Sequence, residues 1–245
     1  MSTSSTEHAP GLFIRGFAPP LRLADFKLIA FDMDSTLINI ECVDEIADAA
    51  GRKAEVAEIT EAAMRGEIAD YKDSLRRRVA LLKGVTEAHL AHVYRSRLRL
   101  NPGAAELVLA CKAAGLKVLL VSGGFTYFAE RLRDRLALDF ARSNRLEIVD
   151  GMLTGRMLDQ SWGDICDGAM KKETLLRTCS LIGCDPAAGA LAASHCDARS
   201  RLSRLIVRRP SRPDQRRAST KSNQCLATLI ARTGGSSASA ARSRW

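Results

Sequence analysis

The chain has 245 residues, of which 46% are hydrophobic and 27% charged, as in a globular protein with one domain or one domain and an insertion. Residues 1–190 carry a net charge of −1, whereas residues 191–245 hold twelve Arg and Lys against two Asp and carry +10. The seven Cys include no C-x-x-C pair, and no apolar stretch suits a signal peptide or a membrane span. These features exclude a secreted disulfide scaffold and predict a protein of the reducing cytoplasm with no membrane partner.

The first element predicted with regular structure is a strand that ends on two carboxylates. We expect residues 1–24 to be a flexible segment, since they contain Ser, Gly and Pro. Residues 28–31 are a continuous apolar run, typical of a strand buried on both faces of a parallel sheet. Asp32 and Asp34 follow, where open α/β sheets bind ligands, and their oxygens suit Mg²⁺ shared with a phosphate. The alternative is a polar strand end that only begins a loop.

Helical patterns dominate the next part of the chain. Residues 41–50, 54–64 and 71–82 have helical apolar spacing, and the segment from about 40 to 95 shows no strand signal. This segment interrupts a βαβ pattern, so we expect it to form a helical cap over the site. A further helix is predicted over residues 103–114, between a Pro and a Gly.

A second apolar run, residues 116–121, ends on Ser122, Gly123 and Gly124 and precedes a helical pattern over residues 126–136. A small-residue turn between a strand and a helix can present backbone N–H groups to a phosphate. Beside the two carboxylates of the first strand, this turn is a candidate phosphate-binding site. By itself such a sequence is more often only a turn.

Residues 145–149 and 152–157 read as a β-hairpin around an Asp-Gly turn. Residues 170–182 then read as a helix that carries Lys171 and Lys172 in its first turn. Cations oppose the helix dipole there, so the pair is either solvated or placed to meet a phosphate.

Together these motifs resemble the haloacid-dehalogenase-like phosphatases, over about residues 27–183. The resemblance implies a Rossmann-like parallel α/β sheet with an inserted helical cap. It is closer to the members that hydrolyse phosphoserine to serine and phosphate in serine biosynthesis. The alternatives are a phosphatase or phosphotransferase for another small phosphomonoester, and a nucleic-acid-binding protein. The stretches that carry the closer resemblance are STLINIECVDEIADAAG, ITEAAMRGEI, SLRRRVALLKGV, VSGGFTYFAERL and NRLEIVDGMLTG.

The resemblance also implies a role for each motif residue. Asp32 is expected to attack phosphorus and form an aspartyl phosphate, and Asp34 to protonate the leaving oxygen and then activate water. Mg²⁺ would be held by the Asp32 carboxylate and the Asp34 backbone carbonyl. Ser122 and the Gly123 N–H would bind phosphate oxygens, and Lys171 would balance their charge.

In the cap, the resemblance implies that Glu41 faces the ammonium group of a small-molecule substrate, phosphoserine. Arg78 would bind the substrate carboxylate through two hydrogen bonds. The alternatives are an exposed Glu at a helix start and a solvated face over Arg76, Arg77 and Arg78.

The resemblance fails after Lys171, where the family pattern requires a strand ending in Gly-Asp-Gly. In this chain the expected first Asp falls at about Ser194, and Asp197, the only carboxylate nearby, is a candidate metal ligand. We therefore expect weakened Mg²⁺ binding and impaired activity.

Arg and Ser make up 21 of the 55 residues from 191 to 245. This composition suggests a shifted reading frame in a gene of high G+C content. We expect a core over residues 25–190, followed by an unfolded tail. A selected basic tail that binds nucleic acid is the less favoured alternative, because Trp245 is its only aromatic residue.

Overall fold

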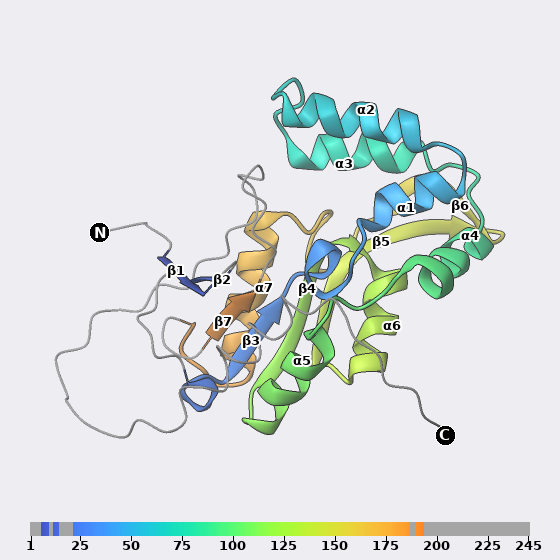
Figure 1. The fold of residues 1–245 in the computed structure, drawn as a ribbon. Helices are drawn as coiled ribbons and strands as arrows, with labels where there is room; N and C mark the ends of the chain where they lie inside the picture. Colours follow the sequence, from blue (N-terminus) through green and yellow to red (C-terminus); the bar gives the residue numbers. More distant parts are fainter. Residues whose placement is uncertain (1–5, 10–11, 15–21, 187–189, 194–245) are drawn as a thin grey trace, which may run out of the picture.

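A mostly parallel sheet forms the centre of the molecule (Figure 1). The computed structural model describes residues 6–9, 12–14, 22–186 and 190–193. The sheet has the order β6-β5-β4-β3-β7; β3, β4, β5 and β7 run parallel and β6 is antiparallel to β5. This is the α/β architecture that the sequence predicts. The strands are β3 (Leu28–Phe31), β4 (Lys117–Phe125), β5 (Phe140–Val149), β6 (Met152–Leu158) and β7 (Ala190–Ala193).

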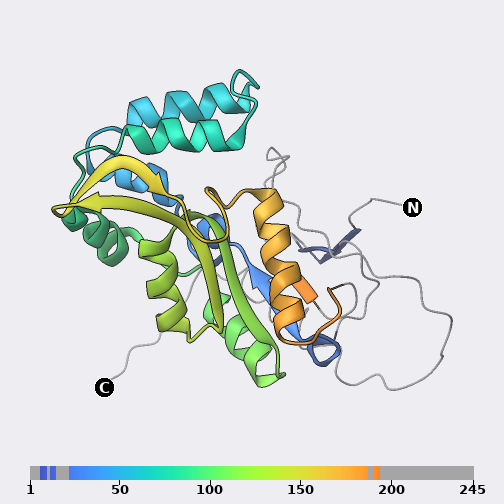
Figure 2. The ribbon, with the colours of Figure 1, turned by 180° about the vertical axis from the view of Figure 1, so that it is seen from behind.

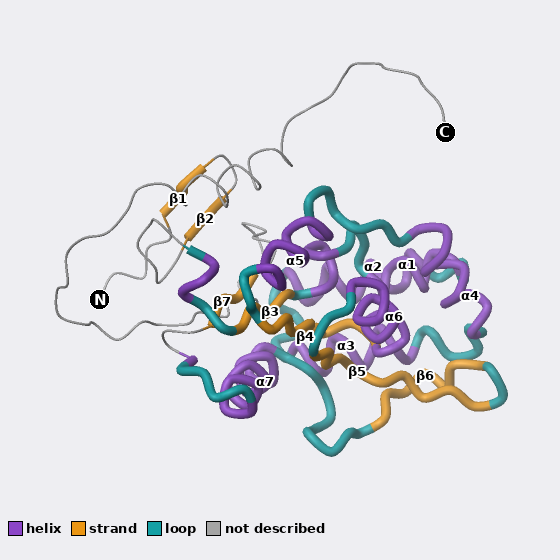
Figure 3. The backbone as a smooth tube through the Cα atoms, turned by 90° about the horizontal axis from the view of Figure 1, so that it is seen from below, coloured by secondary structure: helices purple, strands orange, loops and turns teal. Residues whose placement is uncertain are grey.

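Helices cover both faces of this sheet, which explains the continuous apolar run of its central strand. α5 (Ala104–Ala113) and α6 (Thr126–Leu136) lie on one face, and α7 (Gly168–Leu181) lies on the other (Figure 3). In β3, alternate side chains point to opposite faces. Accordingly, Ile29 and Phe31 belong to the large core cluster that includes residues of α5 and α6, whereas Leu28 and Ala30 pack in a second cluster with residues of α7.

The predicted cap is present and is entirely helical. It consists of α1 (Cys42–Ala49), α2 (Lys53–Met64), α3 (Tyr71–Ala80), α4 (Glu87–His92) and a short helical segment, η3 (Val93–Arg97). In Figure 1, α2 and α3 lie side by side and form a lobe at the far end of the cap.

The two ends of this α2–α3 lobe are tied together. Arg52, just before α2, donates hydrogen bonds from its guanidinium to the carbonyl oxygens of Leu81 and Lys83, just after α3; the bond to Lys83 is 2.7 Å long. The lobe therefore leaves the rest of the molecule and returns to it at nearly the same point.

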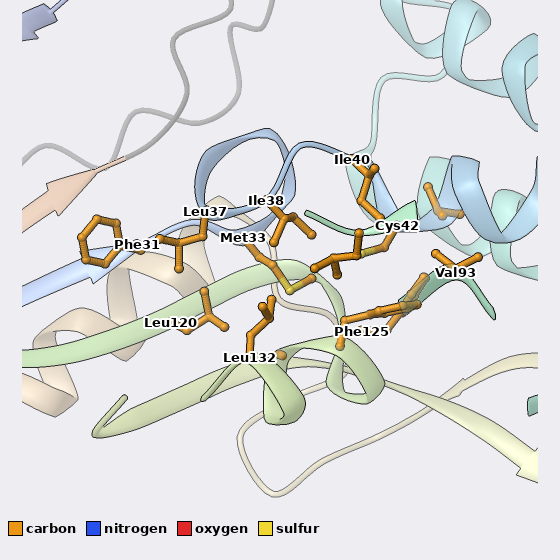
Figure 4. Close-up of a cluster of buried hydrophobic side chains, with 14 of the residues drawn as sticks. Phe31, Met33, Leu37, Ile38, Ile40, Cys42, Val93, Leu120, Phe125 and Leu132 are labelled. Atoms are coloured by element: carbon orange, nitrogen blue, oxygen red, sulfur yellow. The ribbon is translucent and has the colours of Figure 1, made fainter. Parts of the chain in front are cut away.

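Apolar packing continues without a break from the sheet to the base of the cap. Figure 4 shows Phe31, Leu120 and Leu132 at one end of a buried cluster, with Met33 in the middle and Cys42 at the cap end. The Met33 and Cys42 side chains are fully buried. Burying a large apolar side chain stabilises a fold by about 1.5–3 kcal/mol, so this cluster fixes the turn after β3 firmly between sheet and cap.

The predicted hairpin joins β5 and β6 and reaches from the sheet to the cap (Figure 2). Its turn residues Asp150 and Gly151 have φ values of 49° and 72°, the left-handed pair that a tight hairpin turn needs. Leu153 exchanges backbone hydrogen bonds with the segment after α3: Gly84 N donates to its carbonyl and its own N–H donates to Val85 O, both at 2.8 Å. The hairpin thus anchors the base of the cap.

Two segments differ from the prediction. β7 pairs with β3 as far as Ala193, so the ordered sheet extends beyond the expected boundary at 190; its sequence, Ala-Leu-Ala-Ala, is small and apolar enough to continue the sheet. Within the N-terminal segment expected to be flexible, β1 (Thr6–Ala9) and β2 (Leu12–Ile14) form an antiparallel pair. The Ser, Gly and Pro residues that suggested flexibility lie outside those two strands. Among the described helices, none is long and apolar enough to cross a membrane.

Candidate active site

An ion pair between Asp32 and Lys171 joins the end of β3 to the first turn of α7. Asp32 Oδ2 lies 2.6 Å from Lys171 Nζ, and Asp32 Oδ1 accepts a hydrogen bond of 2.8 Å from the N–H of Met33. Both charged side chains are largely buried, at 17% and 16% exposure. Lys171 is therefore not a solvated surface cation: it lies at the carboxyl end of the sheet, beside the predicted nucleophile.

The chain leaves the extended conformation directly after Asp32. Ser35 takes a left-handed φ of 52°, and its N–H donates to Ile40 O at 3.1 Å, so Asp34 lies in a tight turn rather than on a strand. Within the described structure Asp34 Oδ1 is buried and has no hydrogen-bond partner. Burial raises the pKa of Asp34 to about 8, and the negative charges of Glu41 and Asp32 add to the rise. A carboxyl group in this state can carry a proton at neutral pH.

The three small residues after Val121 form a bulge rather than the predicted turn. β4 continues to Phe125, and the pairs Val121–Arg142 and Phe125–Asn144 leave three β4 residues opposite a single residue of β5. A bulge bends its strand and turns backbone groups out of the ladder. The backbone of these residues is thereby freed from regular pairing at the edge where Asp32 lies.

The bulge packs tightly against both the turn after β3 and the cap. Ser122 is 1% exposed, and its Oγ accepts a hydrogen bond of 2.8 Å from Gly124 N. A Cβ atom on Gly124 would lie 2.7 Å from Asp34 Oδ2, and one on Gly123 would collide with the Tyr71 hydroxyl. A larger residue at either position would therefore displace side chains of the site: the Tyr71 hydroxyl at Gly123 and the Asp34 carboxylate at Gly124.

The structure distinguishes the three consecutive arginines of α3. Arg76 pairs with Asp164 at 2.5 Å, and Arg77 pairs with Asp73 of its own helix at 2.9 Å. Among the described residues, no ion pair includes Arg78. Arg78 is therefore the member of the run without an ion-pair partner in the described structure; its Nε donates to Ser74 O at 3.5 Å.

Two acidic residues of the cap lie near this guanidinium. Glu41 directly precedes α1 and accepts a hydrogen bond of 2.6 Å from Ser35 Oγ, which connects it to the turn that carries Asp34. Burial raises the pKa of Asp44, and the positive charge of Arg78 opposes that rise. Glu41 thus joins the cap to the turn that carries Asp34, and Arg78 lies close enough to Glu41 and Asp44 to interact with their charges.

The sequence assigned no role to three further residues of this region. Tyr71, at the start of α3, covers Gly123, and Asn144 contacts the same glycine from β5. Asp164 binds both Lys72, at 2.8 Å, and Arg76, and so joins the cap to the loop before α7. The partners of Asp164 are 88 and 92 residues away in sequence, so only the fold brings them together.

The described residues supply only part of a metal site. They contain no group of three or more His, Cys, Asp or Glu that could hold a metal ion. β7 ends at Ala193, which is paired with Phe31, the residue before Asp32. Ser194 and Asp197, the positions expected to bear on the metal, lie outside the described residues. The Asp32 carboxylate and the Asp34 carbonyl are the two expected donors that the described structure contains.

The sequence and structure match one family. Residues 29–180 match the model of the haloacid dehalogenase-like hydrolases, and the chain belongs to this family. Two similar proteins are the phosphoserine phosphatases of Albidiferax ferrireducens and Polaromonas sp. Each is 72% identical over 181 residues, which is 74% of this chain and 76% or 77% of the relative. The C-terminal region is not covered by these relatives.

Solved structures agree with this assignment. One is described as a phospho-aspartyl intermediate analogue of phosphoserine phosphatase; it has a TM-score of 0.61 and 37% identity, and the match covers 69% of this chain and 78% of that one. A substrate-bound phosphoserine phosphatase complex also has a TM-score of 0.61, with 36% identity and coverage of 68% and 77%.

Proposed function

We propose that this chain is a phosphoserine phosphatase, which hydrolyses O-phospho-L-serine to L-serine and inorganic phosphate. The identity of 72% to two phosphoserine phosphatases supports this substrate. The observation that carries the chemistry is the ion pair of Asp32 and Lys171, set beside the Ser122 bulge and the protonatable Asp34.

In the first step an oxygen of Asp32 attacks phosphorus, and the bond from phosphorus to the seryl oxygen breaks. Asp34 gives its proton to that oxygen, so serine leaves as a neutral alcohol. Lys171, Ser122 and the Gly123 N–H bind the phosphoryl oxygens, and their positive charge and hydrogen bonds stabilise the charge that develops there. The product is an aspartyl phosphate on Asp32.

In the second step Asp34, now ionised, takes a proton from water, which attacks phosphorus. The bond from phosphorus to Asp32 breaks, and inorganic phosphate leaves. Asp34 is suited to both steps because its raised pKa lies close to neutral pH.

Selectivity for an amino-acid phosphate is assigned to the cap. Glu41 would bind the substrate ammonium, and Arg78, which has no ion pair among the described residues, would bind the carboxylate through two parallel hydrogen bonds. The cap would therefore bind the amino-acid end of the substrate, and the core would bind its phosphate.

We propose Mg²⁺ as the cofactor, held by the Asp32 carboxylate and the Asp34 carbonyl, where it would neutralise phosphoryl oxygens. Mg²⁺ demands near-octahedral oxygen coordination. The described residues complete only part of such a site, and the third protein anchor falls to the chain beyond Ala193. Because Ser194 stands where the family pattern has the first Asp of its last motif, we expect weak metal binding and slow turnover.

The test is phosphate release from phosphoserine, with Asp32→Asn and Asp34→Asn as variants. After a rapid acid quench, the parent and Asp34→Asn should carry a phosphoryl group on the peptide that contains Asp32, and Asp32→Asn should not. Phosphate release by Asp32→Asn at the parental rate would refute the assignment of the nucleophile.

A further inference from the structure

The phosphate-binding bulge is held from behind by a buried amide. Asn144 of β5 is fully buried, and both ends of its side chain are used. Its Nδ2 donates to Gly123 O at 2.7 Å, and its Oδ1 accepts from Cys166 N at 2.7 Å. A carbonyl can only accept and a backbone N–H can only donate, so one orientation of the amide satisfies both partners.

On the bulge side, two side chains fix one peptide group. Asn144 holds the carbonyl oxygen of the peptide that links Gly123 to Gly124, and Ser122 Oγ accepts from the N–H of that same peptide. The Gly123 N–H proposed to bind phosphate belongs to a residue whose backbone is therefore anchored. Releasing the carbonyl would let the peptide rotate, because glycine imposes little conformational restraint of its own.

On the other side, Asn144 bonds to the residue before the cap of α7. Asp167, which follows Cys166, caps the helix: its Oδ1 accepts from Met170 N at 2.8 Å, and its carbonyl accepts from Lys171 N at 2.8 Å. The position of Cys166 N thus sets the position of the helix start, and through it that of Lys171.

We propose that Asn144 is a positioning residue that sets the phosphate-binding bulge and the Lys171 helix at the spacing one phosphate requires. The inference rests on the proposed phosphatase function and concerns only the phosphate end of its substrate. Asn144 acts through Gly123 and Lys171, and it touches neither the substrate's amino group nor its carboxylate.

The central variant is Asn144→Asp, which keeps the shape and the acceptor for Cys166 N but replaces the donor that faces Gly123 O with a second acceptor. We expect kcat/KM to fall about tenfold or more, since a buried hydrogen bond is replaced by repulsion between two oxygens. The inhibition constant of inorganic phosphate should rise by a similar factor. The ratio of phosphoserine to aryl phosphate hydrolysis should stay at the parental value, because both substrates share the phosphate.

A protonated Asp can donate, so the defect of Asn144→Asp relative to the parent should shrink as the pH falls. The matched control is Ser143→Ala, the neighbouring buried residue, whose hydroxyl makes no hydrogen bond to the bulge among those described. A purely structural role would lower the melting temperature of Asn144→Asp and leave the phosphate inhibition constant unchanged. That result would overturn the inference.

Binding can be followed without turnover, through amide NMR signals of Gly123, Gly124 and Cys166 during titration with inorganic phosphate. In the parent all three signals should shift with one dissociation constant, and in Asn144→Asp that constant should be about tenfold larger. No shift at Gly123 in the parent would overturn the inference. If phosphate binds as expected but phosphoserine is not hydrolysed, the proposed function fails and the role of Asn144 stands.

Discussion

Lys171 Nζ and Asp32 Oδ2 lie 2.6 Å apart, although 139 residues separate them in the sequence. The pair is held by two rigid elements, since β3 delivers Asp32 and α7 delivers Lys171. A cation at this distance can attract the phosphate dianion to the nucleophile, which would otherwise repel it.

The first prediction concerns this cation. Lys171→Gln should lower kcat/KM for phosphoserine by about a hundredfold or more, because removing one preorganised charge from a developing oxyanion typically costs about 3 kcal/mol. The matched control is Lys172→Gln, since Lys172 is exposed and takes no part in a described ion pair. Steady-state kinetics on both variants checks the prediction, and equal losses would show that general positive charge is what matters.

The second prediction concerns selectivity. Arg78→Ala should weaken phosphoserine hydrolysis roughly tenfold to hundredfold, the usual loss for a charge-assisted hydrogen bond, and leave aryl phosphate hydrolysis near the parental rate. Arg77→Ala is the control, because among the described residues Arg77 pairs only with Asp73, on the helix surface. If both substrates lost the same factor, a carboxylate-binding role for Arg78 would be untenable.

The third prediction concerns the contact between cap and core. Asp164→Asn removes the negative charge that pairs with Lys72 and Arg76, and it should raise the KM for phosphoserine about two- to fivefold, since partly exposed ion pairs contribute about 0.2–1 kcal/mol each. Added salt should also raise the KM of the parent, because it screens these ion pairs. It should raise the KM of Asp164→Asn less. Asp73→Asn, which breaks the ion pair of Arg77 within α3, should change neither quantity. A salt response in Asp164→Asn equal to that of the parent would refute the contribution of this contact.

The fourth prediction concerns the metal. We expect a version of the chain with Gly-Asp-Gly restored after Ala193 to bind Mg²⁺ more tightly and to turn over faster than the chain as it stands. Calorimetric titration with Mg²⁺ and phosphate release at increasing Mg²⁺ measure the difference. Indistinguishable Mg²⁺ dependence in the two would mean that the present tail supplies the missing ligand, with Asp197 as the first candidate.

The restored version and the present chain can also be compared by their melting temperatures. Without a final strand, β3 would form an exposed edge of the sheet. β7 instead pairs with β3 from Ala190 to Ala193, so the β3 backbone groups on this side have partners. The restored version should therefore gain activity with only a modest gain in melting temperature.

The sequence predicted the elements whose patterns are local. The apolar run of β3, the helix from Thr126 to Leu136 and the Asp-Gly hairpin turn appear where they were expected, because strand alternation, helical spacing and turn chemistry act within a few residues. Asp32 and Lys171 form an ion pair, and Ser122 lies on β4, the strand next to β3.

What the sequence missed depends on contacts between distant residues. The bulge after Val121 arises from pairing with β5, since Ser-Gly-Gly alone looks like a turn. Asn144 and Asp164 bind partners that are distant in sequence and that only the fold brings to them. Their neighbours in sequence do not indicate those partners. The choice of Arg78 among three arginines likewise needed the ion pairs of the other two.

The link between Arg52 and the carbonyls of Leu81 and Lys83 has an evolutionary consequence. Because the α2–α3 lobe enters and leaves through this one neck, a different helical hairpin could replace it without altering the strands that carry Asp32 and Ser122. The lobe contains Tyr71 and Arg78, so such an exchange would bring a new preference for the organic part of the phosphomonoester. In this architecture substrate range can therefore diverge by grafting of one lobe, provided that the new lobe keeps the packing against Gly123 and the ion pairs with Asp164.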